Sequence, residues 1–195
     1  MARAARAVVR ELAPFPALAT ARLRLRAFRL DDVDAMHACY GDAEAMRFWN
    51  RPAHARRSET ERVVRRSTVF APGKRLLWAV EEAESGACIG MVNYHNLDQA
   101  HLHAEIGYLL RRDRWGQGLA REAVGAVVGH CFGTMGLHRV QAVIDPDNVA
   151  SRRLVEGFGF RLEGVLRETL FLGGAWRDDC VYGLLAGEWR GLSRA

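Results

Sequence analysis

The chain has 195 residues, of which 49% are hydrophobic, and a formal net charge of +5. This length and apolar content suit one domain with a buried core and a modest tail. The basic excess fits acidic ligands. Nucleic acid is one such ligand, but the sequence has no zinc-finger spacing, RNA-recognition signature or clustered basic helix, so we expect no direct nucleic-acid binding.

The first ten residues are arginine-rich and contain no acid. Arg10, Glu11, Pro14 and Pro16 interrupt the apolar core that a secretory signal needs, and no other stretch approaches a membrane span. We therefore assign residues 1–20 to a basic flexible tail and residues 21–190 to a single domain. We expect a cytoplasmic protein that does not contact membranes.

The first half of the chain predicts two helices and four strands. Alternation over residues 22–26 indicates a half-buried strand, and Leu30 to Val33 offers caps for a helix through about Tyr40. Ser58-x-x-Glu61 has the capping-box pattern and predicts a second helix over residues 58–70, ended by Pro72 and Gly73. Short links then join three strands into an antiparallel meander, over residues 75–82, 87–97 and 102–110.

The second half predicts a long helix from Leu119, because apolar residues recur there at three- and four-residue spacing until the glycines at 133 and 136. A strand, a short helix and a hairpin turning at Gly173-Gly174 follow, over residues 139–144, 149–157, 160–172 and 176–185. The order of elements indicates a mixed α/β fold without internal repeats.

The cysteines and histidines do not predict a metal site. The four cysteines lie far apart and are interpreted as reduced core thiols: Cys39, Cys88, Cys131 and Cys180. His101 and His103 alternate on an expected strand and could present two imidazoles on one face. Because Glu105 is the only carboxylate beside them, we interpret them as exposed strand or rim histidines.

The segment from Arg114 to Ala120 separates an expected strand from the long helix and contains Gly116 and Gly118. Two glycines allow a tight turn, and the unpaired N–H groups of a helix N-terminus attract phosphate. The loop lacks the Lys-Ser/Thr of a P-loop and the third glycine of the dinucleotide fold. It therefore indicates either a pyrophosphate site of another kind or only a tight strand-to-helix turn.

A second element, about thirty residues later, runs from Asp145 to Ser151 between a strand and a helix. Asn148 is a natural N-cap whose side chain can accept from the N–H of Ser151. Capping alone would explain both residue types, so a structural and a functional reading remain open at this point.

Three motifs together resemble the GNAT acetyltransferases: the run from Glu105 to Leu110, Trp115-Gly116-Gln117-Gly118-Leu119-Ala120-Arg121-Glu122-Ala123, and the run from Asn148 to Phe160. Trp115, Asn148-x-x-Ser151 and Gly174-x-Trp176-x-Asp178 make the chain most similar to the RimJ/RimL-type branch, which acetylates protein N-termini. The likeness spans residues 23–185. It implies a central, mostly antiparallel mixed sheet of about seven strands, flanked by about four helices and splayed where the cofactor binds.

Two positions depart from the family pattern. Trp115 stands where the superfamily usually has Gln or Arg, although Trp is common in this branch. Gly157 stands where a helix-favouring polar residue is usual. Neither side chain supplies the backbone amides expected to bind phosphate.

The resemblance implies acetyl-CoA as co-substrate and no metal. Its pyrophosphate would be held by backbone N–H groups of the loop: Trp115, Gly116, Gln117, Gly118, Leu119 and Ala120. Pantetheine would run along the strand edge at Leu109, Leu110 and Arg111, adding to the sheet through its two amides.

The resemblance also implies direct attack of an amine on the thioester in a ternary complex. A backbone N–H near Leu110 would stabilise the oxyanion, Ser151 would donate to the sulfur, and Asn148 would fix the loop. Glu105 would take the amine proton through water, unless it is a strand glutamate bonded to His103 or to a neighbouring strand.

The sequence leaves the acceptor open. A protein N-terminal α-amine is the leading hypothesis, with small amines (a polyamine, an aminoglycoside or an amino acid) and a non-catalytic acyl-CoA-binding regulator as alternatives. Phe48 and Trp49 are candidates for the acceptor wall, although such aromatics are more often core. The chain could be a monomer or a homodimer.

Overall fold

The structure is a computed structural model that describes residues 15–69 and 73–190. Within these ranges the chain forms eight strands, four α-helices and three short 3-10 helices. The strands are β1 (Leu18–Ala19), β2 (Leu23–Arg26), β3 (Leu76–Glu82), β4 (Cys88–Asp98), β5 (His103–Leu110), β6 (Arg139–Ile144), β7 (Arg161–Leu172) and β8 (Ala175–Leu185). The α-helices are α1 (Val33–Tyr40), α2 (Arg57–Ser67), α3 (Leu119–Gly133) and α4 (Val149–Glu156), and the 3-10 helices are η1 (Leu30–Asp32), η2 (Arg112–Arg114) and η3 (Ala186–Glu188).

All described strands belong to one sheet of order β1-β2-β3-β4-β5-β6-β8-β7. Neighbours pair antiparallel except β5 and β6, which are parallel. The mostly antiparallel mixed sheet and the four helices are confirmed. The strand beyond the expected seven is β1, whose two residues are too few to show an alternation in sequence.

Strand β1 lies inside the range that the sequence assigned to a tail. Leu18 pairs with Leu25, and the carbonyl of Pro16 accepts from the indole Nε1 of Trp78 at 2.6 Å. The sheet therefore begins a few residues earlier than residue 21. Residues 1–14 of the proposed tail lie outside the described residues.

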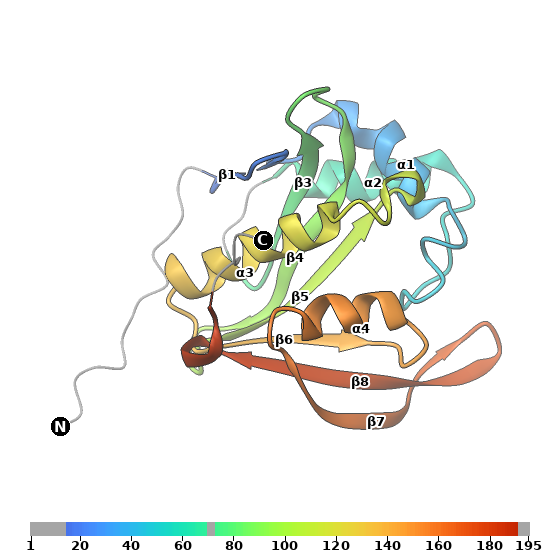
Figure 1. The fold of residues 1–195 in the computed structure, drawn as a ribbon. Helices are drawn as coiled ribbons and strands as arrows, with labels where there is room; N and C mark the ends of the chain where they lie inside the picture. Colours follow the sequence, from blue (N-terminus) through green and yellow to red (C-terminus); the bar gives the residue numbers. More distant parts are fainter. Residues whose placement is uncertain (1–14, 70–72, 191–195) are drawn as a thin grey trace.

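The sheet separates two apolar layers (Figure 1). Helices α3 and α4 pack on one face through residues such as Val124, Val128 and Val155, which belong to the larger core cluster. Helices α1 and α2 pack on the other face, where Met36 and Val64 join a smaller cluster. The four cysteines are free and buried, as predicted for core thiols. No helix in the described ranges is long and apolar enough to cross a membrane.

The central feature of the sheet is a fork between β5 and β6. Their pairing is limited to His103, Ala104 and Glu105 of β5, opposite residues 139–141 of β6. Figure 1 shows the two strands diverging from this common start. On its other side β5 stays paired with β4 as far as Leu110, which lies opposite Gly90. The expected splay is thereby confirmed, and one backbone edge of β5 is left open from Ile106 onward.

Two local predictions were wrong. Helix α2 begins at Arg57, and the carboxylate of Glu59, not Glu61, accepts from the N–H of the N-cap Arg56 at 3.1 Å. The Ser58-x-x-Glu61 pattern is therefore not the capping box, and the helix ends at Ser67, with Phe70 and Pro72 outside the described residues. His101 lies in the turn before β5, not on the strand, because Asp98 accepts from its backbone N–H at 2.9 Å.

Candidate active site

The loop between β5 and α3 has the backbone that its glycines permit. Gly116 has a φ of 73° and Gly118, the N-cap of α3, a φ of 77°. Both lie in the left-handed region, where a residue with a Cβ is strained. The two glycines turn the chain sharply after η2 and direct the first turn of α3 toward the loop.

This geometry leaves a row of free amides. Among the described residues, the N–H groups of residues 116–120 have no recorded acceptor, whereas the N–H of Trp115 donates to Arg112 O at 3.1 Å. The start of a 15-residue helix adds its positive dipole end to these donors. The arrangement fits a bound phosphate group, with Trp115 excluded from the predicted set of amide donors.

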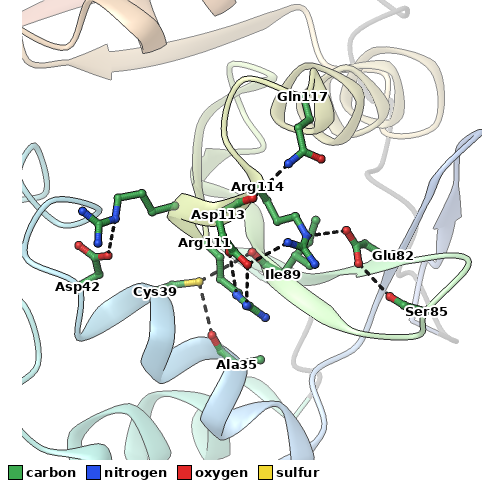
Figure 2. A network of polar contacts seen from close by, with 11 residues as sticks. Ala35, Cys39, Asp42, Glu82, Ser85, Ile89, Arg111, Asp113, Arg114 and Gln117 are labelled. Atoms are coloured by element: carbon green, nitrogen blue, oxygen red, sulfur yellow. Dashed lines mark hydrogen bonds and ion pairs between the residues drawn. The ribbon is translucent and has the colours of Figure 1, made fainter.

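Ion pairs hold the loop to the rest of the fold (Figure 2). Arg114 bonds Glu82 at the end of β3 at 2.7 Å, and Arg112 bonds Asp42 after α1 at 3.1 Å. Within the loop, Arg111 and Asp113 pair at 2.8 Å. The hydrogen bond from Arg114, helped by one from Ser85, lowers the pKa of Glu82. The loop is therefore shaped before any ligand arrives.

Trp115 supplies one more anchor. Its indole Nε1 donates to the carbonyl of Leu110, the last residue of β5, at 2.9 Å. A Gln or Arg side chain is not needed for this contact, because a single donor at the right reach satisfies the carbonyl. The departure from the family pattern at this position thus keeps the loop tied to the strand end.

A further anchor for the loop comes from the N-terminal part of the domain. Arg22 donates through Nη1 to Gln117 O at 3.0 Å and through Nε to Glu122 at 2.7 Å. Glu122, in the first turn of α3, also accepts from Thr20 at 2.5 Å. Burial tends to raise the pKa of Glu122, but the bonds from Thr20 and Arg22 outweigh it and the net pKa is lowered. The carboxylate in the first turn of α3 is therefore already paired with a cation.

The open edge of β5 has a defined register. The N–H of Arg111 donates to Ile89 O at 2.8 Å, so this amide serves the sheet. Because alternate residues of an antiparallel pair direct their backbone groups to opposite sides, Leu109 also faces β4, whereas Tyr108 and Leu110 face the fork. Of the three strand residues expected along pantetheine, Leu110 alone presents its backbone to the open edge.

Asn148 and Ser151 lie at the start of α4, where β6 ends. The side-chain oxygen of Asn148 accepts from the N–H of Ser151 at 3.1 Å, so the capping prediction is confirmed. The hydroxyl of Tyr108, from β5, donates to the carbonyl of Ser151 at 3.5 Å. Burial raises the pKa of Tyr108 to about 12, which keeps this phenol protonated. Tyr108 and Ser151 therefore approach each other across the fork.

Glu105 is the last residue of β5 that pairs with β6. Its Oε1 contacts His95 Nε2 at 2.9 Å, and its Oε2 accepts from Gln141 at 3.2 Å and from Asn96 at 3.5 Å. Burial acts to raise the pKa of Glu105, but the contacts with His95, Gln141 and Asn96 outweigh it and lower the pKa overall. The carboxylate is thus bonded to both neighbouring strands, and no contact with His103 is recorded within the described ranges.

The acceptor-wall candidates are partly buried. Trp49 packs against the smaller core cluster and makes an edge contact with Tyr40, with ring centroids 6.4 Å apart. The guanidinium of Arg47 lies 5.2 Å above the ring of Phe48. Both aromatics therefore have structural partners in the segment between α1 and α2. In the described part of the chain, no group of His, Cys, Asp or Glu side chains could hold a metal ion.

An open strand fork followed by a preformed anion loop defines a transferase that uses a CoA thioester. A family model described as "Acetyltransferase (GNAT) domain" matches residues 22–161, and the chain belongs to this family. It is an acetyl-CoA-dependent N-acetyltransferase.

Three relatives show the range of similarity. The N-acetyltransferase YoaA of Bacillus subtilis is 34% identical over 172 residues, covering 88% of this chain and 97% of that protein. The [ribosomal protein uS5]-alanine N-acetyltransferase of Escherichia coli is 29% identical over 60% of this chain and 61% of that protein. A structure of spermidine N-acetyltransferase from Vibrio cholerae, in complex with CoA and spermine, has the same fold, with a TM-score of 0.76 at 23% identity over 87% of this chain and 98% of that one.

Proposed function

We propose that the protein transfers the acetyl group of acetyl-CoA to a protein N-terminal α-amine. The observation that carries the proposal is the fork between β5 and β6 ending at the free amides of residues 116–120. A pyrophosphate on these amides and a pantetheine arm along the backbone of Tyr108 and Leu110 would bring the thioester to the fork.

The side chains at the fork fit the chemistry of amine acetylation. In this proposal Ser151, in the first turn of α4, donates to the leaving sulfur, and the cap from Asn148 fixes that turn. A backbone N–H near Leu110 stabilises the oxyanion. Glu105 supplies negative charge where the amine must lose a proton. An α-amine has an unperturbed pKa of about 8 against about 10.4 for lysine, so it needs less help to become neutral.

The charged side chains beside the fork are paired with one another. Arg177 of β8 contacts Asp145, just after β6, at 3.6 Å and donates to the carbonyl of Arg47 at 2.9 Å. These contacts bring the backbone at Arg47, between α1 and α2, near the end of β6. Arg47 is also paired, with Glu44 at 3.5 Å, so the rim combines both signs of charge with backbone carbonyls and can hydrogen-bond an extended peptide.

An acceptor screen tests the proposal. Purified protein and acetyl-CoA are incubated with peptides beginning in Ala, Ser or Met, with spermidine and with an aminoglycoside, and CoA thiol release is followed. We expect turnover with the peptides and none with the same peptides blocked at the N-terminus. Turnover with the small amines alone would overturn the proposed acceptor, and thiol release at the acceptor-free rate with every amine would favour a CoA-binding regulator.

A further inference from the structure

The face of β4 and β5 that points toward α1 and α2 carries three polar side chains in one group. Met91 and Leu109 belong to the core cluster on this face, and side chains two residues apart in a strand share a face. Asn93, His95 and Glu105 therefore lie on the same face, with His95 directly opposite Glu105 in the register. Glu105 is the last paired residue before the fork, so the group lies where the open edge begins.

The contact between His95 and Glu105 fixes which imidazole nitrogen carries the proton. Nε2 of His95 lies 2.9 Å from Oε1 of Glu105. A carboxylate only accepts hydrogen bonds, so Nε2 must be the protonated nitrogen and Nδ1 of a neutral ring keeps its lone pair. The other oxygen of Glu105 accepts from Gln141 and Asn96, so donors occupy both ends of this carboxylate.

Two acceptor atoms in this group lack a donor. Within the described residues, Nδ1 of His95 and Oδ1 of Asn93 are both buried without a hydrogen-bond partner. Gly107 lies in the part of β5 that is paired with β4 but no longer with β6. A Cβ on Gly107 would lie 2.8 Å from Asn93 Oδ1 and 3.7 Å from Cε1 of His95. The glycine lets both side chains sit close against the strand at the fork. Two orphaned acceptors beside a carboxylate match a group rich in N–H donors, which a primary ammonium is.

We propose that His95 Nδ1 accepts the proton of the acceptor ammonium, that Asn93 Oδ1 accepts a second N–H of the same group, and that Glu105 is the positioning residue that holds the imidazole tautomer. The inference rests on the proposed function, because it assigns the proton path at that site. It moves the base from the carboxylate expected in the sequence to the histidine opposite it.

The step balances as follows. One N–H proton of the ammonium passes to His95 Nδ1, which becomes imidazolium beside the Glu105 carboxylate and later releases the proton to solvent. The freed nitrogen lone pair forms the C–N bond to the thioester carbonyl carbon. The C–S bond then breaks with its electron pair on sulfur, and the second N–H proton ends on that sulfur by way of the Ser151 hydroxyl.

His103 is the matched control for this assignment. It also lies on β5, two residues before Glu105 on the same face, and its Nδ1 is also buried without a partner in the described ranges. Nε2 of His103 lies 3.9 Å from a carboxylate oxygen of Asp98. Nε2 of His95 lies 2.9 Å from a carboxylate oxygen of Glu105. Of the two histidines, His95 therefore has a carboxylate at hydrogen-bond distance that orients its ring, whereas the Asp98 contact of His103 is too long to do so.

The kinetic experiment compares H95Q, H103Q and E105Q with the wild type, using whichever amine of the acceptor screen is turned over. General acid–base catalysis contributes about 10²–10⁴-fold, so we expect H95Q to lower kcat by at least about 100-fold and to lose the acidic limb of the kcat–pH profile. H103Q should keep the wild-type kcat and the acidic limb of the kcat–pH profile. Retention of the limb in H95Q, or its loss in H103Q, would overturn the assignment.

A second measurement needs no acceptor. ¹⁵N NMR of the histidine rings in the full-length protein reports the tautomer of each neutral imidazole, with H95Q used to assign the His95 signals. We expect His95 as the Nε2–H tautomer in the wild type and a mixture of tautomers in E105Q. An Nδ1–H tautomer in the wild type would refute the role of Nδ1 even if peptide acetylation were confirmed. A failed peptide screen with the Nε2–H tautomer present would refute only the proposed acceptor.

Discussion

The guanidinium of Arg121 occupies the space where a side chain at position 157 would begin. Nη2 donates to the carbonyl of Gly157 at 3.2 Å, and a Cβ on Gly157 would lie 2.6 Å from Nη1. The same guanidinium lies 4.8 Å from the centroid of Phe158. Gly157 therefore departs from the family pattern because Arg121, in the first turn of α3, packs against the end of α4.

Gly157→Ala should cost at most about 1 kcal/mol, because the new methyl group displaces the end of the exposed Arg121 side chain from its carbonyl and ring contacts. Urea unfolding of G157A, R121A and the double variant measures this. We expect the cost of the methyl group to fall sharply when Arg121 is already absent. An equal cost in both backgrounds would show that the two residues do not interact.

Gly90→Ala should unfold the end of the β4–β5 ladder. Gly90 has a φ of 155°, and a Cβ there would meet the carbonyl oxygen of Leu109 at 2.2 Å and Cα of Leu110 at 2.8 Å. Backbone atoms cannot move aside cheaply, so we expect a loss of at least about 3 kcal/mol and a raised KM for acetyl-CoA. Gly164→Ala, in β7 with no atom within 4 Å of the new Cβ, is the control and should change neither value appreciably.

Ser151→Ala should lower kcat by about 10- to 100-fold with little change in KM for acetyl-CoA, because the hydroxyl is needed when the thiolate leaves. Ser151→Thr keeps a hydroxyl and should retain more activity than the alanine variant. Tyr108→Phe removes the hydroxyl that donates to Ser151 O at 3.5 Å and should have a smaller effect. A larger loss in Y108F than in S151A would make Tyr108 the proton donor to sulfur.

His130 should make stability depend on pH. Its side chain is buried in α3 against Trp78, its Nε2 has no partner in the described ranges, and burial lowers its pKa from 6.5. A lowered histidine pKa means that the unfolded chain takes up the proton first, so stability falls as pH drops below about 6.5. His130→Phe removes this proton uptake. Denaturation between pH 7 and pH 5 should show H130F gaining stability relative to the wild type, and parallel curves would contradict the argument.

Most elements were predictable because their patterns are local. The bounds of β6 agree with the expectation residue for residue, and α3 starts at the expected Leu119. The cap on α4 was also predictable, since Asn148 and Ser151 are three residues apart. The start of α2 was not, because two acidic residues two positions apart, Glu59 and Glu61, compete for the same capping role and sequence spacing does not rank them.

The residues around the site were harder to predict because they depend on register between strands. His95 meets Glu105 across a β4–β5 pairing that shifts between His95 and Asp98, where Asn96 takes a φ of 51°. No turn pattern in the sequence predicts this shift in the β4–β5 register. The strand pattern places the side chain of Tyr108 on the same face of β5 as those of Ile106 and Leu110. The contact of Tyr108 with Ser151 could not be predicted, because it depends on how β5 and β6 diverge. The pairing of Arg22 with Glu122 joins residues 100 positions apart.

Strand β5 lies between the two proposed binding regions, one for the co-substrate and one for the acceptor. In the proposed complex its fork side holds the co-substrate, while the acceptor approaches the face toward α1 and α2, so only an acetyl group crosses from one to the other. Across β5 the loop of residues 111–118 is tied to the α1–α2 segment through one recorded ion pair, Arg112 with Asp42. We expect the side chains that select the acceptor to vary on the α1–α2 face while the loop and the fork edge are kept, which would account for one fold in relatives whose names specify a ribosomal protein and a polyamine.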